Sequence, residues 1–364
     1  MKILVIHATA GAGHRRAAEA IFVELKQQGS HDVRIVDALD HTRKGYKEFY
    51  SGSYTVMISH FPWIWKVVFE LLDQKWFGPV VRFLRRMQNT VMGFGLHKFL
   101  IKEQFDQIYS AHFFPNEVAS YLKRSGKIHS QVISVITDFD VHSIWVSKGI
   151  DFYAVACDRT KTRLLQLGVA ADQIKVTGIP TDHHFAQPVD VPTLRRRLGL
   201  KPDTFTVFVA TGSFGIGPID DVIEALDGFQ IIVICGHNKN LYQRLSRDKT
   251  ELVKVHGLVD NMDELMKAAD AMITKPGGLS ISEGLVCGLP LIFFSAIPGQ
   301  EQHNVQILKE YGVGLSDIPI DKMAEVLRRY QASQSELSAV KEKIAVLAKP
   351  HAARDIAAFV TSSS

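Results

Sequence analysis

The same short pattern occurs twice in this chain: a run of β-branched residues, a glycine-rich turn and the start of a helix. Residues 3–6 precede a turn at 7–14, and residues 206–210 precede a second turn at 211–217. A buried strand that turns sharply into a helix is typical of parallel sheets covered by helices on both faces. With 364 residues, 46% of them hydrophobic, the chain is too long for one ordinary core. We therefore predict two α/β domains, each opened by one copy of the pattern.

Charge and cysteine content narrow the class of protein. A formal net charge of +4 is too small to indicate a nucleic-acid partner. The cysteines, Cys157, Cys235 and Cys287, lie far apart without metal-ligand spacing, so we expect buried thiols in a reducing compartment. The sequence has neither a secretory-signal pattern before the first strand nor a run of about eighteen uncharged apolar residues. We expect a cytoplasmic protein that is soluble or peripheral on a membrane.

The stretch 274–283 combines the features that a nucleotide diphosphate requires. It follows a short apolar strand, and Gly277 with Gly278 allows the backbone to approach a ligand closely. The next amides lie at a helix N-terminus, where unpaired N–H groups and the helix dipole favour a phosphate. Glu283 lies near the same end, where its carboxylate can accept hydrogen bonds from a ribose diol. The alternative is an ordinary strand-to-helix turn with a charge in the first turn.

Polar residues also follow the predicted strands of the first half. His14 begins the first helix, after a Gly-x-Gly turn that lacks the third glycine of a dinucleotide fingerprint, so we do not expect a nicotinamide or flavin site. Asp138 follows a buried strand, and the carboxyl ends of parallel strands face the ligand crevice. We interpret His14 and Asp138 as catalytic, with Asp138 or His142 orienting His14. The alternatives are a turn-capping His14 and a metal-binding pair, Asp138 and Asp140. We disfavour the metal because no third oxygen ligand is evident.

The segment from about 46 to 101 is rich in aromatic and basic residues and poor in acids. Pro62 and the Gly78-Pro79 pair break it into short helices whose composition suits the headgroup layer of an anionic membrane. The residues that we predict to contact the acceptor or the membrane are Trp63, Trp65, Lys66, Arg82, Arg85 and Arg86. The alternative is a pair of core helices joined by an aromatic-rich turn. Exposed tryptophans would favour the membrane, and buried ones the core.

A further polar cluster, 298–304, follows the apolar strand predicted at 291–294. Gln300 and Glu301 could hold sugar hydroxyls, since an amide and a carboxylate discriminate hydroxyl positions by geometry. The alternative is a solvated loop.

These motifs run through nearly the whole chain. They are Gly11-Ala12-Gly13-His14, Pro62-Trp63-x-Trp65-Lys66, Thr137-Asp138, Gly178-Ile179-Pro180, Gly212-Ser213-x-Gly215, Cys235-Gly236, Gly257-Leu258-Val259 with Met262, Thr274-Lys275-Pro276-Gly277-Gly278, Glu283, and Pro298-Gly299-Gln300-Glu301-x-x-Asn304. Together they resemble the monogalactosyldiacylglycerol synthase and processive diacylglycerol glucosyltransferase family, which is similar in its C-terminal half to the GlcNAc transferase that completes lipid II. Ala12 departs from the family, which often has another glycine there, and this weakens any claim that the first turn contacts phosphate.

The resemblance implies a GT-B fold of two facing Rossmann-like domains. Residues 1–188 would receive the acceptor and the membrane, 189–345 would bind the UDP-sugar, and 346–364 would form a helix that packs back on the first domain. The UDP-sugar-binding residues that it implies are Gly13, Gly212, Ser213, Gly236, Leu258, Val259, Met262, Pro276, Gly277, Gly278, Ser280, Glu283, Gln300 and Glu301. In this assignment, backbone near Leu258 and Val259 reads uracil, Glu283 holds the ribose, and Gln300 and Glu301 hold the sugar.

The activity implied by the resemblance is hexose transfer from UDP-glucose or UDP-galactose to diacylglycerol. It would invert the anomeric carbon without an essential metal or other cofactor, at an anionic membrane on the inner face of the cell, with no nucleic acid as partner. Our hypothesis is a single displacement in which His14 or Asp138 removes the proton of the acceptor hydroxyl. A base suited to neutral pH favours His14. Three alternatives remain: another acceptor such as a polyprenyl-linked one, a UDP-sugar 2-epimerase of the same fold, and a UDP-sugar-binding protein without activity.

Overall fold

The computed structural model describes the chain apart from residues 10, 30, 44, 48–51, 53–62, 64–66, 68–69, 72, 74–92, 213–214, 216, 248–249, 295, 297–298 and 360–364. Its contacts divide the chain into two compact units. The first unit comprises residues 1–182, 297–303 and 351–364, and the second comprises 183–296 and 304–350. This division falls after residues 182 and 350, whereas the sequence analysis placed its boundaries after 188 and 345.

The first unit is built on a parallel sheet of six strands in the order β2-β1-β3-β4-β5-β6. The strands are β1 (Lys2–His7), β2 (Asp32–Asp37), β3 (Gln107–Ser110), β4 (Gln131–Val135), β5 (Phe152–Val155) and β6 (Ile174–Val176). The α-helices are α1 (Ala12–Gln27), α5 (Phe94–Glu103), α6 (Phe113–Arg124), α7 (Asp158–Gln166) and α16 (Ala352–Ala357), with short 3-10 turns η1 (Ala38–His41), η2 (Ser143–Trp145) and η3 (Ala171–Gln173).

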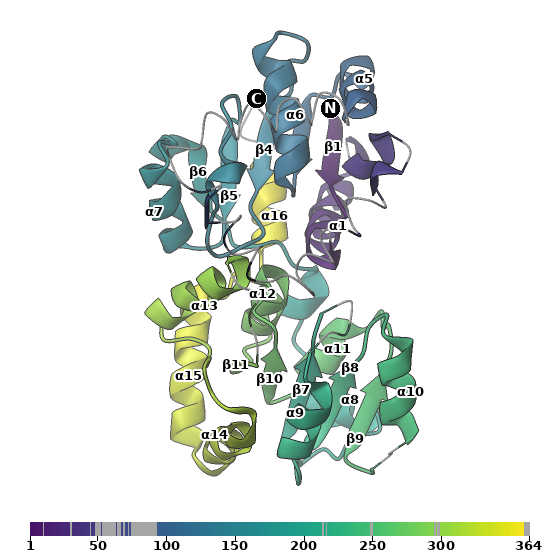
Figure 1. The fold of residues 1–364 in the computed structure, drawn as a ribbon, viewed down its shortest axis with the longest axis vertical. Coiled ribbons are helices and arrows are strands. Elements are labelled where there is room, and N and C mark those ends of the chain that lie inside the picture. Colours follow the sequence, from purple (N-terminus) through teal and green to yellow (C-terminus); the bar gives the residue numbers. More distant parts are fainter. Residues whose placement is uncertain are drawn as a thin grey trace. The chain divides into compact units, whose positions relative to one another are not determined.

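Alternate residues of each strand in the first unit enter two different cores. Leu4 and Ile6 of β1 pack in a cluster with residues of α5 and α6. Ile3 and Val5 of the same strand pack on the opposite face, in a cluster that includes Ile356 of α16. Because both faces are covered, the strands carry apolar residues at nearly every position. The last helix, drawn in yellow in Figure 1, therefore lies among the elements of the first unit and contacts α1.

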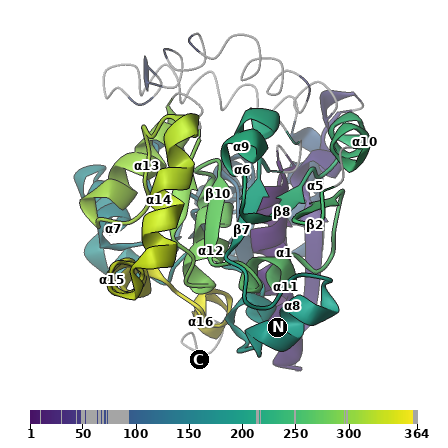
Figure 2. The same cartoon turned by 90° about the horizontal axis from the view of Figure 1, so that it is seen from below.

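The second unit has a parallel sheet of five strands in the order β11-β10-β7-β8-β9. The strands are β7 (Thr206–Ala210), β8 (Gln230–Ile234), β9 (Val253–His256), β10 (Ala271–Thr274) and β11 (Leu291–Phe293). The helices are η4 (His183–Ala186), α8 (Val191–Arg197), α9 (Ile219–Ala225), α10 (Lys239–Arg247), α11 (Met262–Lys267), α12 (Gly278–Val286), α14 (Ile320–Ala332) and α15 (Gln334–Leu347), and α13 (Gln300–Glu310) belongs to this unit from Asn304 on. Figure 2 shows α9 and α14 on one side of this sheet and α11 and α12 on the other.

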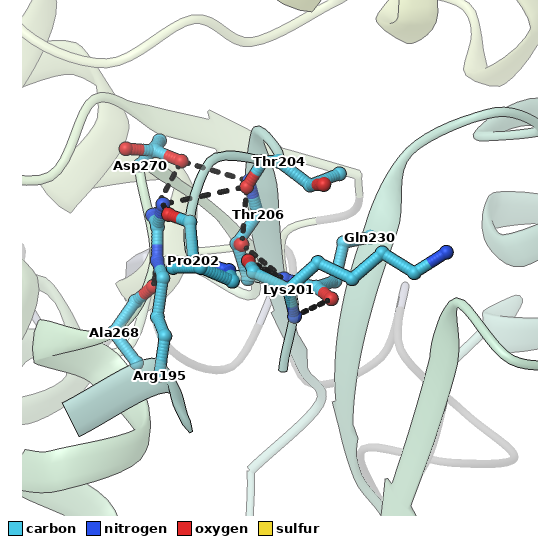
Figure 3. Close-up of polar contacts among 8 residues, drawn as sticks. All are labelled: Arg195, Lys201, Pro202, Thr204, Thr206, Gln230, Ala268 and Asp270. Atoms are coloured by element: carbon cyan, nitrogen blue, oxygen red, sulfur yellow. Dashed lines mark hydrogen bonds and ion pairs between the residues drawn. The ribbon is translucent and has the colours of Figure 1, made fainter. Parts of the chain in front are cut away.

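A buried arginine fixes helix α8 to the amino ends of two strands of the second sheet (Figure 3). The guanidinium of Arg195 forms an ion pair with Asp270 at 2.6 Å and donates to the carbonyls of Ala268 and Pro202. Asp270 also accepts from the backbone N–H of Thr206, the first residue of β7, at 2.8 Å. This network lies at the sheet edge opposite to the carboxyl ends, so it anchors the fold and leaves the other edge to the site.

The prediction of two Rossmann-like units, each with a parallel sheet between layers of helices, is confirmed. Within the described part of the chain, no helix is both long enough and apolar enough to cross a membrane.

Candidate active site

The helix α12 begins directly after the turn that follows β10, and no side chain caps its N-terminus. Gly277 is the N-cap residue, with φ −73° and ψ 136°. This conformation is open to any residue, and a Cβ atom added to Gly277 would meet nothing within 4 Å. The fold therefore gives no reason for glycine at this position. Close approach of a ligand to the first amides of the helix does give a reason.

The turn before α12 is held from the side by the next helix of the same unit. The side-chain amide of Asn304, on α13, donates to the carbonyl of Pro276 at 3.1 Å, and Asn304 is completely buried. This bond fixes the direction of the peptide that leads into Gly277. The amides at the start of α12 are thus preorganised rather than free to turn with a surface loop.

Three further turns lie at the same edge of the second sheet. Gly212 follows β7 with φ 77°, Gly236 follows β8 with φ 56°, and Leu258 follows β9, where its side chain is 61% exposed. From β10 to β9 the sheet spans three strand spacings, roughly 14 Å. An extended nucleotide diphosphate of that length can lie along this edge with its phosphates at α12 and its base near Leu258.

A buried hydroxyl at this edge has no hydrogen-bond partner among the described residues. It belongs to Thr211, the residue after β7, and only 4% of the residue is exposed. The register pairs Ala210 with Thr274, so Thr211 lies beside the turn that leads into α12. A buried hydroxyl without a partner costs free energy unless a ligand or a water satisfies it.

In the first unit, His14 lies at the start of α1 above the ends of neighbouring strands. Its Nδ1 atom is 2.9 Å from the carbonyl oxygen of Ala111, after β3, and 2.9 Å from the hydroxyl oxygen of Thr137, after β4. The ring of His112 packs against it edge to face at 4.8 Å between centroids, and that of Trp145 lies at 6.3 Å. The ring of His14 is therefore held in one orientation.

Burial controls the charge of this histidine group. Loss of solvent lowers the pKa of His14 to about 4, with the nearby His7 acting in the same direction and the Ala111 carbonyl opposing it. Burial also lowers the pKa of His112 well below its ordinary value. Both rings are neutral at physiological pH. His14 can therefore accept a proton. The sequence argument for this base assumed a pKa near neutrality, and the pKa of His14 lies well below that.

The two groups expected to orient His14 form other contacts. Asp138 accepts a hydrogen bond from the side-chain amide of Gln300 at 2.7 Å. Nδ1 of His142 accepts from the backbone N–H of Ile144 at 3.0 Å. Within the described residues, the hydrogen bonds of the His14 ring nitrogens are with Ala111 and Thr137, so these two residues, and not Asp138 or His142, hold its ring.

Asp140 likewise has a partner of its own. Its carboxylate pairs with Nδ1 of His303 at 3.0 Å, and this hydrogen bond raises the pKa of His303. Asp138 and Asp140 thus contact two residues of the polar cluster that the sequence analysis singled out at 298–304.

Two protein-family models match successive parts of the chain. Residues 14–181 match the family model of monogalactosyldiacylglycerol (MGDG) synthase, and residues 206–356 match that of the glycosyltransferase family 28 C-terminal domain. The chain thus consists mainly of a region that matches the MGDG synthase model followed by a region that matches the family 28 C-terminal model. This confirms the resemblance inferred from the sequence motifs.

Relatives and solved structures match this glycosyltransferase along nearly the full length of the given chain. A processive diacylglycerol β-glucosyltransferase of Bacillus pumilus is 28% identical over 372 residues, covering 100% of this chain and 95% of the relative. Acinetobacter baumannii MurG has a TM-score of 0.62 at 15% identity, with 99% of each chain covered. Anabaena Alr3699/HepE in complex with UDP-glucose has a TM-score of 0.58 at 15% identity, with 100% of each chain covered. The two structures show the fold alone, and it is the predicted GT-B fold.

Most of the other residues predicted to bind the UDP-sugar lie in the second unit and at the start of α13. Glu283 is buried in α12, one turn beyond Gly278 and Ser280. Val259 and Met262 follow β9, and Met262 begins α11. Gly13 lies in the first turn of α1, in the other unit. Gln300 and Glu301 begin α13, and Ser213 lies outside the described residues.

Most of the predicted acceptor and membrane residues also lie outside the described part of the chain: Trp65, Lys66, Arg82, Arg85 and Arg86. Trp63 is helical and 67% exposed. Val67 and Leu71 are helical as well, with 48% and 47% of their surface exposed. Trp63, Val67 and Leu71 are thus three exposed apolar residues that recur every four positions in the sequence.

Sequence reasoning missed several residues that shape these sites. Thr137, Ala111 and His112 surround His14, while Asn304 and Thr211 lie beside the turn before α12. Thr137 and Asn304 were present in the motifs but received no role. The carbonyl of Ala111 could not be found in this way, because every residue has a backbone carbonyl and the residue type does not indicate which one is used.

Proposed function

We propose that this glycosyltransferase transfers a hexose from a UDP-sugar to diacylglycerol at the surface of an anionic membrane. The observation that carries the proposal is the MGDG synthase match over residues 14–181, joined to a unit whose helix α12 presents uncapped amides beside glycine turns. The relatives named as diacylglycerol β-glucosyltransferases support the lipid acceptor and a hexose donor.

The donor occupies the carboxyl edge of the second sheet. The diphosphate binds the amides of Gly278 and Ser280, next to Gly277, where the helix dipole stabilises its negative charge. Glu283 accepts hydrogen bonds from the ribose, and backbone near Leu258 contacts uracil. Gln300 and Glu301 are assigned to the sugar hydroxyls, as the motif comparison implies.

The acceptor enters at the first unit, with the enzyme peripheral on the inner face of the cell membrane. The exposed side chains of Trp63, Val67 and Leu71 support this assignment, since exposed aromatic and aliphatic side chains suit the headgroup boundary. The basic residues of the same segment, which follow in the sequence, attract anionic lipids.

The reaction is a single displacement with inversion. His14 takes the proton of the acceptor hydroxyl, the hydroxyl oxygen attacks the anomeric carbon, and UDP leaves with the bonding electron pair. The N-terminus of α12 stabilises the charge of the leaving diphosphate. The reaction requires no metal, because helix amides take over the neutralisation of the diphosphate. Chelation of divalent cations is therefore expected to leave turnover within about twofold of the untreated enzyme, and loss of activity restored by Mg²⁺ would contradict this part of the proposal.

The test is transfer of label to lipid. The purified chain is incubated separately with radiolabelled UDP-glucose and UDP-galactose on anionic vesicles containing diacylglycerol, and the extracted lipid is counted. Label in the lipid from one donor supports the proposal and identifies the sugar. Binding of UDP without lipid label, repeated with polyprenyl phosphate vesicles, would favour another acceptor, and conversion of the free UDP-sugar would favour an epimerase.

A further inference from the structure

The contacts of His14 determine which of its ring nitrogens carries a hydrogen. Nδ1 lies 2.9 Å from the carbonyl oxygen of Ala111. A carbonyl can only accept a hydrogen bond, so a distance of 2.9 Å is favourable only when Nδ1 bears the hydrogen. The neutral ring is then the Nδ1–H tautomer, and its lone pair is on Nε2.

The hydroxyl of Thr137 contacts the same nitrogen. Its Oγ1 atom is also 2.9 Å from Nδ1. Because the carbonyl already requires the hydrogen on Nδ1, the hydroxyl shares this hydrogen as a second acceptor and directs its own proton elsewhere. Thr137 is only 5% exposed, so water does not compete with it.

The opposite end of the ring is available for chemistry. Over the described ranges of the chain, neither a hydrogen bond nor an ion pair engages Nε2 of His14. The rings of His112 and Trp145 pack against the imidazole and restrict its rotation. Nδ1 is thus held by two hydrogen bonds, and Nε2 is left able to accept a proton.

We propose that Thr137 is a positioning residue that, together with the Ala111 carbonyl, holds His14 as the Nδ1–H tautomer and directs the Nε2 lone pair at the acceptor hydroxyl. The proposal rests on the proposed function, in which His14 is the base. In the reaction the acceptor O–H bond breaks and its proton moves to Nε2. The new bond joins the acceptor oxygen to the anomeric carbon, and the bond from that carbon to the diphosphate oxygen breaks.

The anchor has a second effect once His14 has accepted the proton. The resulting imidazolium keeps its Nδ1–H between the two acceptors, which stabilise the positive charge. A carboxylate performs this task in a Ser-His-Asp triad. Here both acceptors are neutral, so they raise the basicity of the ring less than a carboxylate would. This agrees with the low pKa of His14 and with the opposing action of the Ala111 carbonyl on it.

The experiment compares the Thr137→Val and Thr137→Ser variants with the wild-type chain. Valine keeps the shape and removes the hydroxyl, whereas serine keeps the hydroxyl. Thr160→Val is the matched control, since the buried Thr160 hydroxyl donates to the Phe139 carbonyl without contacting His14. The ¹⁵N shifts of His14 are followed by NMR across the pH range, with His7 and His112 assigned in the same spectra, and kcat and the Kd for UDP are measured in parallel.

The wild type is expected to show Nδ1–H and an unprotonated Nε2 at neutral pH. Thr137→Val should lower kcat about tenfold, as the loss of one hydrogen bond to a charged group predicts, and lower the pKa of His14. Its Kd for UDP should not change, and Thr137→Ser should restore both values. A wild-type ring protonated on Nε2, or a valine variant with unchanged kcat and His14 titration, would overturn the proposal.

The two proposals fail in different ways. A wild-type chain that labels no lipid contradicts the proposed function, whatever the variants do. If the wild type labels lipid and the Thr137→Val variant labels it equally fast, only the role of Thr137 is contradicted.

Discussion

The side-chain amide of Asn304 donates to the carbonyl oxygen of Pro276 at 3.1 Å, so a helix that comes later in the chain supports the turn in front of α12. Both residues belong to the second unit. The bond connects the position of α13 to the direction of the amides that are proposed to bind the diphosphate.

Replacing Asn304 by leucine should weaken UDP binding. Leucine preserves the branched shape but leaves the buried Pro276 carbonyl without a donor, which costs about 1–3 kcal/mol and favours a shifted turn. We expect the Kd for UDP, measured by calorimetry, to rise about tenfold. Gln173→Leu is the control, because Gln173 donates in the same way to the Ile150 carbonyl of the first unit. Equal Kd values for the Asn304 variant and the wild type would contradict the supporting role.

Alanine at position 277 should separate folding from binding. The backbone angles at Gly277 suit any residue, and its Cβ would meet no atom within 4 Å, so we expect an unchanged melting temperature. The added methyl group would nevertheless stand where the diphosphate approaches, and we expect the Kd for UDP to rise at least about tenfold.

Gly284→Ala is the opposite case on the same helix. Its Cβ would lie 2.7 Å from Leu291 and 3.1 Å from Met272, so this variant should lose about 1–3 kcal/mol of unfolding free energy. If Gly277→Ala binds UDP with the affinity of the wild type, the diphosphate does not bind at the turn before α12.

The pH dependence of kcat/KM should identify His14, because kcat/KM should fall at an unusually low pH. A base is active only when deprotonated, and the pKa of His14 is about 4, so kcat/KM should fall only as the pH approaches 4. An ordinary histidine would cause the fall near 6.5. His14→Ala should lower turnover at least about a hundredfold while leaving the Kd for UDP nearly unchanged. Wild-type turnover in this variant would contradict the assignment of His14.

The same pKa shift affects stability, with a defined sign. The unfolded chain binds a proton at His14 below pH 6.5, whereas the folded chain does so only below about 4. The contribution of His14 to the unfolding free energy is therefore fully present above pH 6.5 and is lost as the pH falls to about 4. Denaturant titrations of the wild type and His14→Ala should converge over this range as the pH is lowered. Parallel curves would show that the ring titrates normally.

Replacing Arg195 by methionine should destabilise the second unit strongly. The variant leaves Asp270 without its cation and removes the donor to the carbonyls of Ala268 and Pro202, which we expect to cost about 3 kcal/mol. Lys322→Met is the control, since Lys322 pairs with Glu325 on the surface at 3.9 Å and should change stability by less than about 0.5 kcal/mol. Urea unfolding curves of the two variants provide the comparison. A similar midpoint for both would show that the Arg195 network does not stabilise the fold.

The sequence predicted the framework of the fold because its signals are local. A run such as 206–210 is apolar at nearly every position, as a strand covered on both faces must be, and a glycine turn follows it at once. The turn before α12 could be located for the same reason. Each of these features is complete within about ten residues.

The surroundings of His14 could not be predicted in the same way. His14 lies 97 residues before Ala111 and 123 before Thr137 in the sequence. Ala111 and Thr137 follow β3 and β4, and only the strand order β1-β3-β4 brings the three residues together. The acidity of His14 depends on burial by the same neighbours. Asp138 and His142 have suitable chemistry and suitable positions after strands, but their hydrogen bonds lie with Gln300 and Ile144.

Helix α16 has a consequence for the synthesis of this protein. Ile356 and Ala357 are completely buried beside Ile3 and Val5, so the core begun by the first strand is completed by a helix that is translated after all the strands of the second unit. While the ribosome makes the intervening residues, one face of the first sheet lacks this cover. A chain that stops at residue 350 would leave that face open to water and to other unfinished chains, so it would expose an apolar surface that favours aggregation.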